Sequence, residues 1–125
     1  MNNNRRYFLR ISVALDAQIR TTDGSDFAVK IVDLSDVGIK ISCNKTVAFS
    51  ILPAGQQSLG SVYDVDLGLL FNLPDNSRHK IDCSCRVVFS IRLAQDKFLF
   101  GLLINEIDAE DLRQIKDYVQ EQVLL

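Results

Sequence analysis

Two short polar segments carry the side chains best suited to binding chemistry. The first ten residues contain Arg5, Arg6 and Arg10, and the segment Asp33-Leu34-Ser35-Asp36-Val37-Gly38 follows further along the chain. Guanidinium groups pair with phosphates through two parallel hydrogen bonds and also recognise O6 and N7 of guanine. The arginines therefore indicate a site for an anionic ligand, and one that carries guanine fits them well.

The second segment supplies hydrogen-bond acceptors and a turn. Asp33 can accept hydrogen bonds from the N–H groups of guanine, and Ser35 can contact a phosphate or cap the turn through the backbone. Gly38 either permits a positive φ or lets a ligand approach the backbone closely. Alone, such a segment is also typical of an ordinary hairpin turn, and a basic terminus is usually only solvated. The presence of both segments in one chain favours a binding site.

The distribution of charge narrows the class of ligand. The chain has 14 basic and 16 acidic side chains and a formal net charge of −2. Residues 1–10 hold three of the basic side chains and no acidic one, so a small basic arm precedes an acidic body. Nucleic-acid binding usually needs a broad basic face. The charges therefore favour a compact ligand with few negative charges, and we expect no nucleic-acid binding.

Alternating apolar residues predict a mostly β structure. The alternation predicts six strands, at residues 11–20, 27–34, 39–43, 63–71, 81–91 and 98–104. The second and third form a hairpin whose tip carries the Asp33–Gly38 segment. Residues 44–60 contain Pro53, Gly55 and Gly60 and are predicted to be a long connection with room for a short helical turn.

The last stretch changes to a helical period. Its apolar residues are spaced by three, four and four positions, at Leu112, Ile115, Val119 and Val123. Asp108 is the expected N-cap. We expect one domain with a six-stranded antiparallel β-barrel and C-terminal α-helix at residues 11–125, preceded by a flexible basic ligand-binding arm at residues 1–10.

The sequence offers no catalytic constellation. The sole histidine, His79, is expected to be exposed beside a turn. The acidic pairs Asp64/Asp66 and Glu110/Asp111 are most simply a solvated strand face and a helix N-terminus. We therefore expect no enzyme activity, no metal site and no cofactor.

The three cysteines, Cys43, Cys83 and Cys85, form neither an even disulfide framework nor a CxxC pair. They are expected to be small buried thiols in a reducing compartment. No stretch approaches the roughly 20 apolar residues needed to cross a bilayer, and the N-terminus does not look like a signal peptide. A cytoplasmic protein without membrane insertion is the expectation.

Taken together, the two segments resemble the RxxxR and (D/N)xSxxG signatures of the PilZ domain, the bacterial receptor module for cyclic di-GMP. Arg6 and Arg10 match the first signature, and Asp33, Ser35 and Gly38 match the fixed positions of the second. The resemblance extends over nearly the whole chain, including the strand that ends near Phe100-Gly101-Leu102-Leu103 and the acidic start of the last helix. The segment Ala54–Gly60 departs from the family in its length and glutamine content.

The resemblance implies that Arg5, Arg6, Arg10, Asp33, Ser35 and Gly38 bind cyclic di-GMP. An arginine at the position of Arg5 is associated in this family with two stacked ligand molecules per site. The implied mechanism is closure of the arm over the ligand, which relays a signal to a downstream protein of unknown identity. One alternative is a PilZ-like protein-interaction module that no longer binds the ligand. Another alternative is a small barrel that binds single-stranded nucleic acid, and the acidic body of the chain disfavours it.

Overall fold

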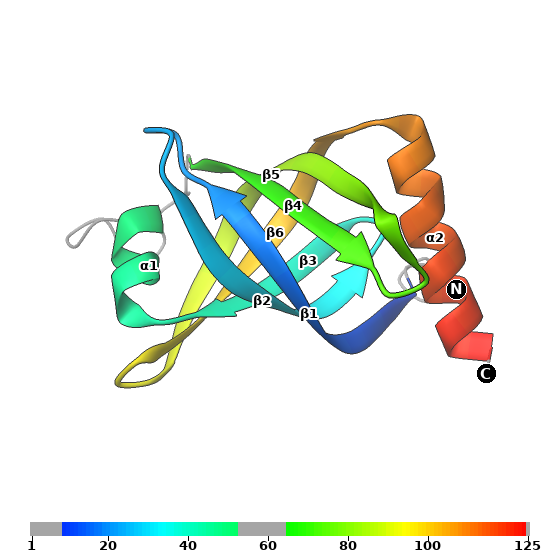
Figure 1. Cartoon of the computed structure of the whole chain (residues 1–125). Helices are drawn as coiled ribbons and strands as arrows, with labels where there is room; N and C mark the ends of the chain where they lie inside the picture. The colour runs from blue at the N-terminus through cyan, green and yellow to red at the C-terminus, as the bar shows by residue number, and fades with distance from the viewer. Residues whose placement is uncertain (1–8, 53–64, 125) are drawn as a thin grey trace, which may run out of the picture.

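The computed structural model describes residues 9–52 and 65–124. It is a closed antiparallel β-barrel with a helix at each end (Figure 1). Its strands are β1 (Arg10–Arg20), β2 (Asp26–Ser35), β3 (Gly38–Cys43), β4 (Asp66–Leu73), β5 (Asn76–Ala94) and β6 (Lys97–Ile107). The helices are α1 (Lys45–Ile51) and α2 (Ala109–Leu124). Neighbouring strands follow the order β1-β2-β3-β6-β5-β4 around the barrel. The predicted fold class is confirmed.

β5 begins earlier than the alternation predicts, and the predicted long connection starts with a short helix, for which the prediction left room. β5 begins at Asn76, before the predicted residue 81, because its polar first residues pair with the end of β4 and need no apolar alternation. The 44–60 connection starts with a seven-residue helix, α1. Its N-cap is Asn44, whose side chain accepts a hydrogen bond from the Val47 amide at 2.9 Å. Residues 53–64 lie outside the described residues.

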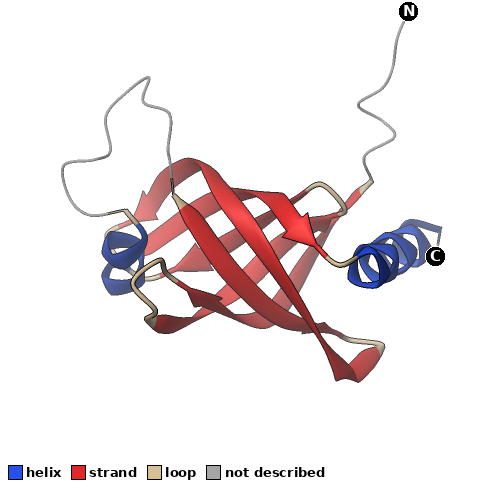
Figure 2. Ribbon diagram, turned by 90° about the horizontal axis from the view of Figure 1, so that it is seen from above, coloured by secondary structure: helices blue, strands red, loops and turns tan. Residues whose placement is uncertain are grey.

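The core lies inside the barrel and under α2. The alternation in β1 to β6 turns one face of each strand inward, and inward side chains such as Ile31, Leu69 and Phe100 are fully buried. α2 closes one end of the barrel with Ile115, Tyr118 and Val119 (Figure 2). Neither described helix is long and apolar enough to cross a bilayer.

The amphipathic stripe of α2 is shorter than predicted. Val123 belongs to the predicted apolar stripe but is 44% exposed, because the last turns of α2 run past the strands. Leu124 is likewise exposed. Packing on the barrel thus uses the middle of the helix and leaves its C-terminal end in solvent.

The start of α2 is tied to β5. Asp108 caps the helix as predicted, since its carboxylate accepts a hydrogen bond from the Glu110 amide at 3.1 Å. Glu110 and Asp111 lie in the first turn of α2, as expected for a helix N-terminus, but the burial of Asp111 was not predicted. Asp111 is buried, with Oδ1 2.6 Å from His79 Nε2, and its Oδ2 accepts a 3.4 Å hydrogen bond from the Asp82 amide. His79 is 43% exposed and has a structural contact that anchors the helix.

A close contact between β5 and β6 explains one glycine. Gly101 pairs with Phe89, and a Cβ at Gly101 would overlap the Phe89 ring. The glycine therefore lets an aromatic side chain lie flat across the backbone of β6. At Gly68, by contrast, an added Cβ would make an ordinary 3.5 Å contact with Arg20 Cβ.

We expect Gly101→Ala to lower the free energy of unfolding by about 1–3 kcal/mol, because the Phe89 ring must move or the strands must separate. The matched variant Gly68→Ala should change it by less than about 0.5 kcal/mol. Urea unfolding followed by circular dichroism measures both. Equal effects in the two variants would contradict the contact.

The cysteines lie in or next to the core, as predicted. Cys83 and Cys85 are buried with their Sγ atoms 3.8 Å apart, and the contact with Cys83 together with burial raises the pKa of Cys85. Burial raises the pKa of the half-buried Cys43 to about 11. Its thiol therefore stays protonated through neutral pH.

Alkylation should reveal this protonation. At pH 8 we expect Cys43 in the folded chain to react with iodoacetamide about 100-fold more slowly than an exposed cysteine, because only the thiolate attacks. The rate should keep rising with pH until about 11, measured by mass spectrometry of the Cys43 peptide. A plateau of the alkylation rate near pH 9 would contradict the raised pKa of Cys43.

Candidate ligand-binding site

Strand pairing brings the two polar segments together. In the register between β1 and β2, Arg10 lies opposite Ser35 and Ser12 lies opposite Asp33. Arg10 Nε donates a hydrogen bond to Asp33 Oδ1 at 3.2 Å. The structure therefore brings together four of the six predicted site residues: Arg10, Asp33, Ser35 and Gly38. Arg5 and Arg6 lie outside the described residues, and their role stays a prediction.

Ser35 holds the turn between β2 and β3. Its side chain is buried, and its Oγ accepts hydrogen bonds from the amides of Val37 at 3.1 Å and Gly38 at 2.9 Å. The same hydroxyl donates to the Gly38 carbonyl at 3.0 Å. Of the two roles that the sequence left open, this structure displays the turn cap.

Gly38 lies close to the backbone of β6. A positive φ is not the reason for a glycine here, because the only positive φ in the described part of the chain is at Gly24. A Cβ at Gly38 would lie 3.0 Å from the Leu102 carbonyl oxygen of β6. Of the two alternatives that the sequence offered for Gly38, the positive φ is therefore wrong, and close approach of a ligand to the backbone stays a prediction.

The Arg10–Asp33 ion pair lies at the surface, and its Asp33 side chain is more buried than its Arg10 side chain. The Arg10 side chain is 58% exposed and the Asp33 side chain is 19% exposed. Lys40, on β3, places Nζ 4.0 Å from Asp33 Oδ2. Because such exposed pairs contribute little to stability, a ligand can replace them at low cost. Lys40 was not predicted, although its position two residues after Gly38 puts it on the same strand face.

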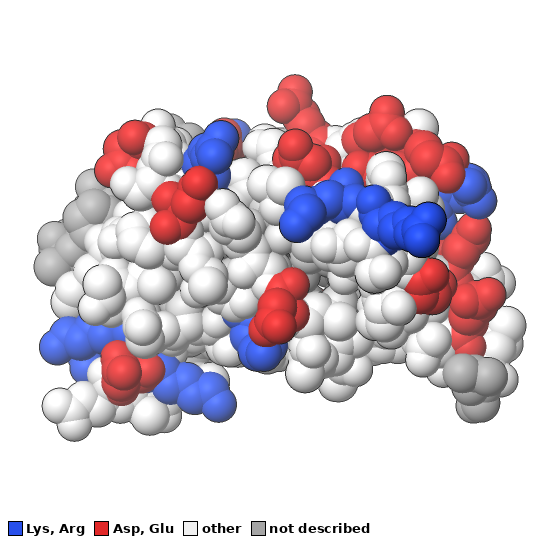
Figure 3. All heavy atoms as spheres, viewed as in Figure 1, with Lys and Arg blue, Asp and Glu red and all other residues white. Residues whose placement is uncertain are grey.

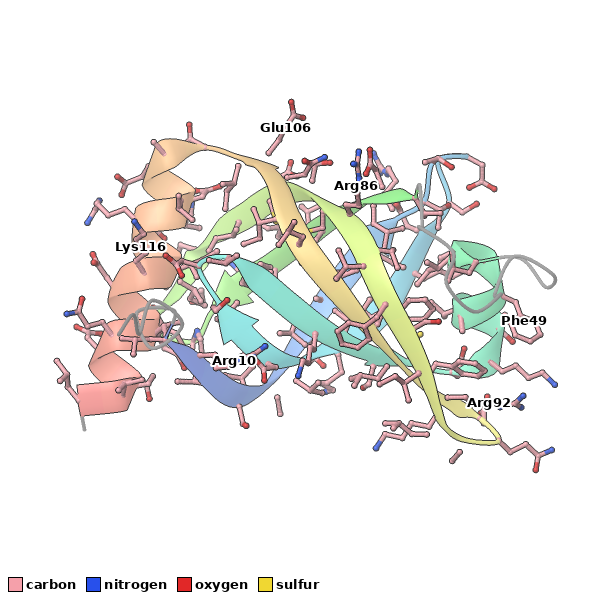
Figure 4. The ribbon with its side chains drawn as sticks, turned by 180° about the vertical axis from the view of Figure 1, so that it is seen from behind. Arg10, Phe49, Arg86, Arg92, Glu106 and Lys116 are labelled. Atoms are coloured by element: carbon pink, nitrogen blue, oxygen red, sulfur yellow. The ribbon has the colours of Figure 1, made fainter. Side chains whose placement is uncertain are left out.

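A hollow of about 480 Å³ opens beside this pair. Its polar side is formed by Arg10, Ser35, Gly38 and Lys40, and its apolar side by residues of β5 and β6 that include Val88, Phe89 and Leu103. The volume is within the usual range for small-molecule sites, which combine an apolar surface with a few polar groups. Arg10 is seen at this face of β3, β6 and β5 in Figure 4.

A second hollow of about 320 Å³ connects the motif turn with α2. It is lined by Leu9, Asp36, Lys116, Val119 and Gln120. The chain therefore enters β1 between the turn and the helix. Among the described residues, no group of three or more His, Cys, Asp or Glu side chains is placed to hold a metal ion.

The family assignment rests on nearly the whole chain. A family model described as the PilZ domain matches residues 4–121. The chain belongs to the PilZ domain family. PilZ domains are a family of cyclic di-GMP receptors and are generally non-catalytic.

Solved structures support the PilZ fold. Bacillus subtilis MotI/DgrA, an inhibitor of motility, superposes with a TM-score of 0.69 at 22% identity, over 96% of this chain and 51% of that chain. The K. pneumonia MrkH–c-di-GMP complex gives a TM-score of 0.67 at 14% identity, over 99% and 54%.

The PilZ domain of YcgR from Escherichia coli, solved with c-di-GMP, gives a TM-score of 0.65 at 13% identity, over 94% of this chain and 90% of that chain. This chain spans about half the length of the MotI and MrkH chains that it matches. A search of curated proteins found no match.

Ser35→Ala should lower the free energy of unfolding by about 1–3 kcal/mol, since it leaves two turn amides without their acceptor. The matched control is Ser50→Ala in α1, which removes one exposed hydrogen bond to the Thr46 carbonyl and should cost less than about 0.5 kcal/mol. Thermal or urea unfolding distinguishes them. A neutral Ser35→Ala would show that the hydroxyl does not hold the turn.

Proposed function

We propose that this protein is a cyclic di-GMP receptor that binds the ligand at the hollow beside Arg10, Asp33, Ser35 and Gly38, with Arg5 and Arg6 closing over it. The observation that carries the proposal is the exposed Arg10–Asp33 pair at the edge of this hollow. Membership of the PilZ family supports the choice of ligand.

Each side of the hollow suits a different part of the ligand. Arg10 and Lys40 provide cations for phosphate oxygens, and the Arg10 guanidinium can also reach O6 and N7 of guanine. Asp33 provides acceptors for guanine N–H groups. The apolar side chains of Val88 and Leu103 offer a surface against which a purine face can lie. Ser35 positions the turn that carries these groups.

The proposed response is closure of the arm and relay to a protein partner. Ordering the arm costs about 1–2 kcal/mol per residue, and each charge-assisted hydrogen bond returns about 1.5–3 kcal/mol. Arg5, Arg6 and Arg10 together can offset that cost. The receptor would act in the cytoplasm, where a reducing environment keeps its cysteines as thiols.

An interaction module that no longer binds the ligand is the competing possibility. A ligand that binds only the folded state stabilises it by about 2.7 kcal/mol at ~100 times its dissociation constant. A thermal shift with cyclic di-GMP therefore supports the receptor, and no shift at saturating concentrations favours the module.

Arg10→Ala should weaken cyclic di-GMP binding by about 10- to 100-fold, because it removes one or two charge-assisted hydrogen bonds. Arg20→Ala is the matched control, since Arg20 lies at the other end of β1 and also forms an ion pair with an aspartate of β2, Asp26, through two hydrogen bonds. Isothermal titration calorimetry should show unchanged affinity in that control. Equal affinities in both variants would place the ligand elsewhere.

Arg5 determines the number of ligands in this proposal. A stacked pair of cyclic di-GMP molecules carries about twice the phosphate charge of one, so it needs an additional cation. Calorimetry of the unaltered chain should give two ligands per chain, and Arg5→Ala should reduce the number to one. Arg6→Ala should weaken binding of the first ligand too. A stoichiometry of one in the unaltered chain would refute the role of Arg5.

A further inference from the structure

The hairpin between β5 and β6 carries exposed apolar side chains at the end of the barrel far from α2. Every residue from Ile91 to Lys97 is exposed, so both faces of this ribbon meet solvent. Ile91 is 47% exposed and Leu93 is 52% exposed. In Figure 1 the yellow hairpin extends beyond the barrel, below α1. Clustered apolar side chains on a projecting tip mark an interaction site.

The adjacent helix adds an aromatic side chain to the tip. Phe49 of α1 is partly exposed and packs edge-on against Phe98, with 6.0 Å between ring centroids. The Lys45 amide donates a 2.8 Å hydrogen bond to the Asp96 carboxylate, which joins α1 to the hairpin. Phe49 and Arg92 lie near each other at this end in Figure 4. We call Lys45, Phe49, Ile91, Arg92, Leu93 and Lys97 the hairpin patch.

The hairpin patch is basic although the chain as a whole is acidic. Lys45, Arg92 and Lys97 form no ion pair with any described residue, and the one acid at the tip, Asp96, is bonded to a backbone amide. In Figure 3 basic side chains gather at the lower left, over this end, around one acidic side chain, whereas acidic and basic side chains are mixed on the right, over and beside α2. The hairpin patch itself carries three cations beside the single acid Asp96.

The tip is also fixed in shape. The Arg92 guanidinium donates hydrogen bonds to the carbonyls of Ala94 at 3.3 Å and Gln95 at 2.8 Å, and it lies over the Phe98 ring at 5.1 Å. These contacts hold the turn, so Leu93 is presented without a further ordering cost. Ile91 and Leu93 are two positions apart on β5, so they share one face of this preformed projecting tip, and a deformable medium such as lipid can close around it.

We propose that the hairpin patch docks this protein on an anionic lipid bilayer, with Leu93 and Ile91 entering the headgroup region and the three cations held by lipid phosphates. Apolar burial together with attraction between cations and anionic lipid is how peripheral proteins bind membranes. The absence of a long apolar run, which led us to expect no membrane insertion, concerns helices that cross a bilayer and not a hairpin docked at its surface.

Docking in this orientation leaves the ligand site accessible. Arg10 lies toward α2, whereas Phe49 and Arg92 lie at the opposite end, beside α1 (Figure 4). The polar side of the ligand hollow, with Arg10 and Lys40, would therefore remain in water while the tip contacts lipid. This inference does not depend on which nucleotide the hollow binds.

A tryptophan reporter tests the proposal directly, because the chain contains no tryptophan. With vesicles of phosphatidylcholine mixed with phosphatidylglycerol, the emission of Leu93→Trp should shift to shorter wavelength. High salt should reverse the shift, and phosphatidylcholine alone should give none. The matched control is Val123→Trp at the exposed end of α2, whose emission should stay unchanged.

Sedimentation of the full chain with the same vesicles completes the test. Lys97→Ala should weaken the partition coefficient about fivefold, and Leu93→Asp by more than about tenfold. Both residues are exposed, so the variants should unfold at the same temperature as the unaltered chain and bind cyclic di-GMP like the unaltered chain in calorimetry.

Two results would overturn the proposal: equal emission shifts for tryptophan at positions 93 and 123, or equal binding of the chain to neutral and anionic vesicles. A shift without vesicles that grows with protein concentration would instead indicate contact between copies of the chain, and would also overturn it.

Discussion

The antiparallel register of β1 against β2 is the constraint on which the site depends. β1 is paired on both sides, with β2 along its length and with β4 near its end, so it cannot slide without breaking the closed sheet. This register sets Arg10 opposite Ser35, at the start of the strand. Leu9 and Arg10 therefore lie beside the motif turn.

The residues at the site divide into those that build the turn and those whose charged groups have only weak partners. Ser35 uses its hydroxyl on turn amides and the Gly38 carbonyl, and Gly38 gives room for β6. Arg10, Asp33 and Lys40 have only weak, partly exposed ion pairs with one another. The first group would affect ligand binding through the shape of the turn, whereas the second can contact the ligand itself.

Local patterns predicted the strands, the helix cap and the juxtaposition of the motifs, because each depends on residues close in sequence or on simple hairpin pairing. Contacts between distant residues were not predictable. The pair His79–Asp111 joins residues 32 positions apart, and nothing in a first helical turn distinguishes a buried acid from a solvated one. The close approach of the Leu102 carbonyl of β6 to Gly38 is likewise a contact between distant residues. The roles of Arg5 and Arg6 stay predictions.

The account is tested most directly by nuclear magnetic resonance of the labelled chain during a titration with cyclic di-GMP. The Arg10 Nε–H resonance reports the group that now donates to Asp33, and backbone amides report the motif turn and the hairpin patch. We predict that the largest shifts occur at Arg10 Nε–H and along residues 33–40, while residues 92–97 stay unchanged. An unchanged Arg10 resonance at saturation, or shifts centred on the hairpin, would contradict the proposed site.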